Sequence, residues 1–175
     1  AMAAVGVNHP APITLDLQNP PVDLSSPITG RDVDLVQQTF ARVAMLGSNT
    51  IGRLLFMNIF KIAPGAVDLF PFAKGDANMW RPGSALECHA LKVVETVATA
   101  VSLLKDLDTL VPVLQSLGLK HVGYGVIPAH YDVVGQAFIA TLEATLGRHF
   151  TESVKNAYLK VWKIVKDTMV SDSYA

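Results

Sequence analysis

The chain has 175 residues, of which 50 % are hydrophobic and 17 % charged, and its formal net charge is −1. This length suits one domain with a sizeable core, and the charge gives no electrostatic reason to expect a nucleic acid or an anionic membrane as a partner. The longest apolar stretch, 93–104, is interrupted by polar residues and is too short to span a bilayer, and the single Cys88 excludes an intrachain disulfide.

Residues 1–28 differ from the rest of the chain in composition. They contain five of the ten prolines and only two charged residues, Asp16 and Asp23. Proline fixes φ and lacks an N–H group, so this density opposes both helix and sheet. We expect 1–28 to form an extended or disordered arm, 29–170 to form the domain, and 171–175 to form a C-terminal tail. The start lacks the basic and apolar regions of a signal peptide, which predicts a cytoplasmic protein.

The pattern becomes helical from Thr29, which is suited to cap a first helix. Gly47-Ser48-Asn49 should end this helix. The second helix should end near Pro64, because the residue before a proline avoids the helical conformation. The apolar residues of the first helix recur at helical spacing: Val33, Val36, Phe40 and Val43.

The second half of the chain also predicts helices. Ser84 should cap a helix of about 20 residues, whose length and apolar spacing favour helix over strand despite its many valines. No segment requires a strand, so we predict an all-α domain of about seven to eight helices. The last three long helices are bounded by similar signals: Asp106 or Asp108 to Gly123, Pro128 to Gly147, and Thr151 onward.

Two histidines, His89 and His121, lie on separate apolar helices and are 32 positions apart. Two imidazoles presented from facing helices can ligate a haem iron on its two sides. A single histidine on an apolar helix is more often a core or rim residue. That plainer interpretation is preferred for His9, His130 and His149.

The helix order and the spacing of particular residues resemble those of the globin family from about Thr29 to Met169. Pro64 lies six residues before Phe70, as the family's C-helix proline precedes the phenylalanine that stacks on the haem. The segment 117–121 is similar to that of the neuroglobin and cytoglobin group of tissue globins. Further matching positions are Lys92 and Val93, which follow His89, and Leu117 and Val126, which flank His121.

The resemblance implies a globin fold that encloses haem b (iron protoporphyrin IX). It implies His121 as the proximal iron ligand and His89 as the distal residue, which donates to a bound gas or binds the iron itself. Leu117 and Leu114 share a helical face with His121 and should pack under the same side of the haem. The second ring nitrogen of His121 should donate to a carbonyl one turn earlier. The other expected cofactor-binding residues are Phe56, Phe70, Lys92, Val93 and Val126.

Two packing positions complete the comparison with the family. Gly52 and Ala90 are small residues at positions where the family's second and fifth helices cross closely. Phe40 is a departure, because most animal globins carry tryptophan there, but the position is one of packing and puts little of the resemblance in doubt.

The function implied is reversible binding of dioxygen, NO or CO, with His89 able to coordinate iron in a hexacoordinate resting form. The alternative is redox chemistry at the same iron, as electron transfer, NO dioxygenation or nitrite reduction. This alternative requires an external reductase, because the chain has no nucleotide-binding domain of its own. A non-haem interaction module is disfavoured because both histidines are present. Whether the chain is an enzyme, and whether it forms a homo-oligomer, are left open.

Overall fold

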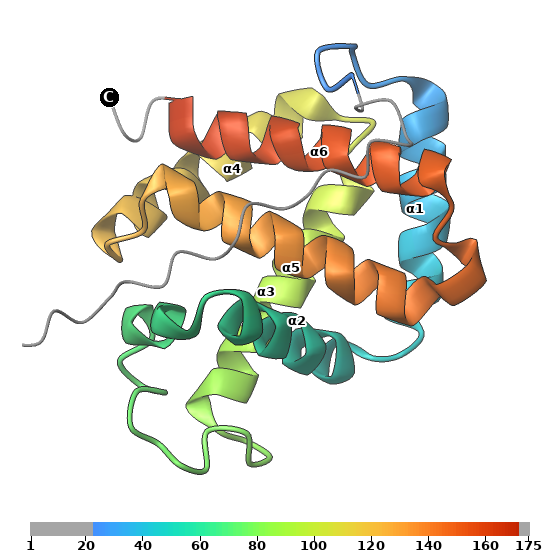
Figure 1. Ribbon diagram of the computed structural model, residues 1–175. Coiled ribbons are helices and arrows are strands. Elements are labelled where there is room, and N and C mark those ends of the chain that lie inside the picture. Colours follow the sequence, from blue (N-terminus) through green and yellow to red (C-terminus); the bar gives the residue numbers. More distant parts are fainter. Residues whose placement is uncertain (1–22, 172–175) are drawn as a thin grey trace, which may run out of the picture.

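The computed structural model describes residues 23–171, which form six α-helices and two 3₁₀ helices and contain no strand (Figure 1). The predicted all-α fold is therefore confirmed for this part of the chain. Most of the expected arm, 1–22, and the tail residues 172–175 lie outside the described residues. The helices are α1 (Gly30–Ala44), α2 (Ser48–Ile62), η1 (Pro64–Leu69), α3 (Ala85–Ser102), α4 (Leu107–Gly123), α5 (Pro128–Leu146), η2 (Gly147–His149) and α6 (Glu152–Ser171).

Side-chain caps start most of the helices where the sequence predicts them. Thr29 forms a reciprocal capping box with Asp32 at α1, and Ser84 accepts a hydrogen bond from the backbone of Glu87 at α3. Of the two alternatives for α4, Asp106 is the cap. The break after α1 is shorter than predicted. Gly47 has a φ of 85° and makes the turn, so α2 already begins at Ser48.

The helices pack in crossed pairs around one apolar core. α2 packs on both α3 and α5, and α6 packs on α1, α4 and α5. Figure 1 shows α5 and α6 side by side and antiparallel, with α3 running crosswise to both. The expected apolar face of α1 is buried, and Phe40 belongs to it with an exposed fraction of 5 %. This arrangement brings His89 on α3 against α2, and places His121 in the last turn of α4.

Two polar contacts tie helices together inside the core. The Tyr158 hydroxyl on α6 lies 3.1 Å from Thr39 Oγ1 and 3.2 Å from the Val36 carbonyl oxygen on α1. The Asn58 amide on α2 donates to Thr141 Oγ1 on α5 at 3.0 Å. Both contacts satisfy polar groups that would otherwise be costly to bury.

Within residues 23–171, no single helix is long and apolar enough to cross a membrane. Among the helices that the structure describes, only α1 and α2 taken together reach that length and composition, and they are bent by 104° relative to each other.

Candidate functional site

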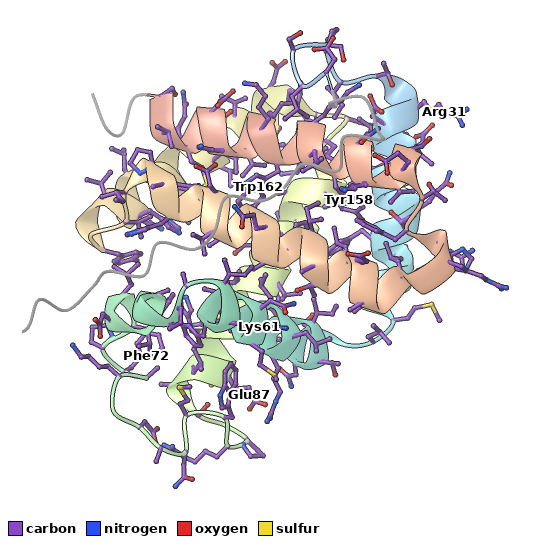
Figure 2. All side chains as sticks on the ribbon, in the orientation of Figure 1. Arg31, Lys61, Phe72, Glu87, Tyr158 and Trp162 are labelled. Atoms are coloured by element: carbon purple, nitrogen blue, oxygen red, sulfur yellow. The ribbon has the colours of Figure 1, made fainter. Side chains whose placement is uncertain are left out.

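His89 lies in a cage of phenylalanine rings. Its ring centroid is 5.6 Å from that of Phe56 on α2, 5.4 Å from Phe70 after η1, and 5.5 Å from Phe72. Phe72 belongs to the segment between η1 and α3 (Figure 2). Its side chain is 44 % exposed. Two segments, α2 and the one that follows η1, therefore border the imidazole on α3 with apolar, aromatic rings.

These surroundings favour the neutral form of His89. Burial lowers the pKa of His89 below its ordinary value of 6.5, and the nearby His121 and Lys92 lower the pKa further. The ring makes no hydrogen bond to another residue of the described segment 23–171. A neutral imidazole has one nitrogen with a free lone pair and one N–H group. His89 can therefore act as a metal ligand or as a hydrogen-bond donor.

His121 is held in one orientation by its own helix. Its Nδ1 lies 2.8 Å from the Leu117 carbonyl oxygen, one turn earlier on α4. A carbonyl oxygen only accepts, so Nδ1 carries the proton and donates it. In the neutral ring this leaves the lone pair on Nε2, which is the arrangement that an imidazole ligand of a metal needs. The predicted hydrogen bond one turn earlier is confirmed.

Two tyrosines border the His121 ring, and the sequence reasoning identified neither of them. Their ring centroids lie 5.9 Å (Tyr124) and 6.0 Å (Tyr131) from that of His121. Tyr124 is 64 % exposed, whereas Tyr131 on α5 is 5 % exposed. Tyr131 lies ten positions after His121 and across a turn. No helical spacing could therefore indicate that the two side chains meet.

The other residues predicted for the site differ in burial. Phe56 and Leu114 are each 2 % exposed and belong to the core. The backbone N–H of Val126 donates to the His121 carbonyl oxygen at 3.1 Å, which fixes Val126 beside the end of α4. Lys92 is exposed, so its ammonium group is free to meet an anionic group of a ligand. Four predicted apolar residues are only partly buried and so retain surface that a flat apolar ligand could cover: Phe70, Val93, Leu117 and Val126.

The remaining histidines do not form a second site. His130 Nδ1 accepts a hydrogen bond from the backbone of Ile127 at 3.2 Å and so helps to cap α5. His149 is exposed in η2, and His9 lies outside the described residues. Nowhere in 23–171 do three His, Cys, Asp or Glu side chains gather as a bare metal ion would require. A metal between His89 and His121 would need further ligands from a cofactor, and the planar nitrogen ligands of a haem fit that need.

Comparisons with known proteins identify similar chains. The globin family model matches residues 53–169. Neuroglobin of Danio rerio is 34 % identical over 128 residues, which cover 71 % of this chain and 80 % of that protein. An anaerobic nitrite reductase of Brassica napus is 34 % identical over 110 residues, covering 61 % of this chain and 68 % of that protein.

A solved structure shares the fold. It is the crystal structure of a hexacoordinated haem protein from an anhydrobiotic tardigrade, and it superposes with a TM-score of 0.77 at 20 % identity. The superposition covers 87 % of this chain and 99 % of that chain.

Proposed function

Since this chain belongs to the globin family and is neuroglobin-like, we propose that it holds haem b and binds dioxygen, NO or CO reversibly. In this proposal His121 is the proximal iron ligand and His89 stands on the opposite side. The observation that carries the proposal is the hydrogen bond from His121 Nδ1 to the Leu117 carbonyl, which leaves the Nε2 lone pair available. When bound, the haem supplies an iron at which a diatomic gas is held.

The protein's own residues would perform four tasks around that cofactor. His121 would provide a nitrogen donor from α4. Leu117 and Val126 provide apolar surface beside His121, and Phe70 and Val93 provide it beside His89. Lys92 is exposed and three residues after His89, where its ammonium group would pair with a haem propionate. The phenylalanine rings would surround the partly buried His89 with apolar groups, and such surroundings strengthen a hydrogen bond that the imidazole donates.

His89 would also bind iron itself when no gas is present. Its neutral ring and the absence of a competing hydrogen bond within 23–171 support this role. The name of the tardigrade protein, whose fold is shared, describes that protein as hexacoordinated. A gas would then displace His89, and its apparent affinity would fall in proportion to the fraction of protein in the open form.

Redox chemistry is the second candidate, supported by the 34 % identity to a plant protein named anaerobic nitrite reductase. Such activity would require an external reductase. Turnover of nitrite with a supplied reductant separates the two candidates. A rate no higher than that of an ordinary oxygen-storage globin would leave gas binding as the function.

The test is the visible absorption spectrum of the purified protein, reduced and free of dioxygen and carbon monoxide. Sharp, split visible bands would indicate a low-spin iron with six ligands and support His89 as the sixth. One broad band would indicate an open site and support gas storage without His89 ligation. If the protein shows no haem band after haem is added, the proposal fails.

A further inference from the structure

We propose that Trp162 and Tyr131 are positioning residues for the proximal imidazole, through which α6 controls the orientation of His121. This inference rests on the proposed function and deepens it. In this inference, Trp162 on α6 and Tyr131 on α5 help to set the orientation of the imidazole that would bind the iron. The contacts that carry it run in sequence from α6, through the backbone of α5, to the ring of His121.

The hydrogen bond from His121 Nδ1 to Leu117 holds the imidazole at only one point. A planar ring held at one point can still rock about its bond to Cβ. The Tyr131 ring limits this motion, because its centroid is 6.0 Å from that of His121 and the two planes are inclined by only 37°. Tyr124 is also close to His121 but is 64 % exposed, so of these two tyrosines only Tyr131 is held firmly by its surroundings.

Tyr131 is in turn fixed by α6. The indole Nε1–H of Trp162 donates to the Tyr131 carbonyl oxygen at 3.2 Å, and the ring centroids of Trp162 and Phe138 are 6.3 Å apart. Figure 2 shows the Trp162 side chain directed from α6 toward α5. The indole thus reaches the backbone of α5 in its first turn, at the residue whose ring borders His121.

Gly135 makes this contact sterically feasible. It lies one turn after Tyr131 on the same face of α5. A Cβ atom at Gly135 would lie 2.4 Å from Trp162 Nε1 and 2.8 Å from Trp162 Cδ1. Any larger residue would therefore displace the indole from the Tyr131 carbonyl. A close approach of this kind is one that glycine permits and other residues do not.

The first experiment measures the iron–histidine stretching band by resonance Raman spectroscopy on the ferrous holoprotein. A His89→Leu background keeps the iron five-coordinate, so that the band is observable. Trp162→Phe removes the indole N–H but keeps an aromatic ring, and Gly135→Ala pushes the indole away. Both variants should shift the frequency of the band in the same direction or increase its width. Thr141→Val, also in α5 but outside this series of contacts, should lower stability and leave the band in place.

The second experiment needs no haem. In the apoprotein, hydrogen exchange of the Trp162 indole N–H should be slower than in free tryptophan, and Gly135→Ala should remove this protection. Exchange as fast as in free tryptophan would overturn the inference. So would an unchanged Raman band in Trp162→Phe and Gly135→Ala when haem is bound. If instead the unmodified protein shows no haem band after haem is added, the proposed function itself fails, whereas the exchange experiment on the apoprotein still tests the contacts of Trp162.

Discussion

Gly52 on α2 lies so close to Ala90 on α3 that a Cβ atom built on Gly52 would be 3.0 Å from the carbonyl carbon, the carbonyl oxygen and the Cβ of Ala90. The two helices therefore meet at backbone distance, as expected from the small residues at these positions. Both residues are buried, with Ala90 2 % exposed. Because Ala90 follows His89 directly, this crossing sets the distance between His89 and Phe56 on α2.

The crossing predicts a stability loss in Gly52→Ala. The added methyl group meets backbone atoms, which yield less easily than the end of a side chain. We expect unfolding of the apoprotein in urea to show a loss of about 1–3 kcal/mol. Gly30→Ala is the matched control, because Gly30 is also helical and nothing lies within 4 Å of its added Cβ. An equal effect of both substitutions would contradict the close approach.

Thr141→Val should destabilise the protein because it leaves the Asn58 amide without its hydrogen-bond acceptor. Thr141 is 0 % exposed, and its hydroxyl accepts from the Asn58 amide. Valine keeps the shape but leaves that amide without this acceptor, at a cost of about 1–3 kcal/mol in the free energy of unfolding. Thr96→Val makes the same chemical change at an exposed site on α3 and should stay within about 0.5 kcal/mol. A double-mutant cycle with Asn58→Leu should show coupling, and strict additivity would argue against the contact.

Tyr158 should make the apoprotein sensitive to alkali. Burial raises the pKa of Tyr158 from 10.0 to about 12, although the hydrogen bond with Thr39 acts in the opposite direction. The unfolded chain releases this proton near pH 10, while the folded chain retains it. The stabilising contribution is therefore complete below pH 10 and is lost as the pH rises toward 12.

Tyr158→Phe should reduce this loss between pH 10 and 12. At neutral pH the variant should be less stable by about 1 kcal/mol, because the contacts with Thr39 and Val36 are gone. Chemical unfolding at several pH values, with the exposed Tyr124→Phe as control, measures both effects. Parallel curves for parent and Tyr158→Phe above pH 10 would refute the assignment.

His121→Gly should abolish stable haem retention, because it removes the proposed proximal ligand. Free imidazole added to the variant should restore a haem spectrum by supplying the missing nitrogen donor. The exposed His149→Ala serves as control and should retain haem like the parent. A normal yield of holoprotein from His121→Gly without added imidazole would exclude His121 as the ligand.

His89→Leu should leave haem bound but remove any six-coordinate resting form. The same variant should release dioxygen faster, because the donor facing the gas is gone. Stopped-flow measurements and the reduced visible spectrum test both expectations. If the resting spectrum is the same as that of the parent, His89 does not bind the iron.

The parts of the fold that depend on local chemistry were predictable from the sequence. Thr29, Ser84 and Thr151 cap their helices as predicted, because a capping hydroxyl acts on an amide two or three residues away. The Leu117–His121 hydrogen bond spans a single helical turn and was predictable for the same reason. The pattern predicted a break over Gly47-Ser48-Asn49. Gly47 alone makes the turn, so α2 begins earlier than predicted, at Ser48.

Contacts between side chains on different helices could not be predicted from the sequence pattern. Trp162 and Tyr131 meet across two helices and are 31 positions apart, and their approach depends on a glycine that no periodic pattern marks. Tyr131 also reaches His121 across a turn. Resemblance to a family predicts ligand positions, but the supporting contacts of this chain depend on its own side chains. The roles of Phe56, Phe70, Lys92, Val93, Leu114 and Val126 toward a haem stay predictions.

The place of His121 on α4 has an electronic consequence. It lies in the last turn of α4, two residues before the final residue Gly123, where the aligned peptide dipoles present partial negative charge. Such an end favours a nearby positive charge by about 0.3–1 kcal/mol. An iron held by this imidazole carries one more positive charge in its oxidised state than in its reduced state. The end of α4 should therefore favour the ferric state and lower the reduction potential of the site.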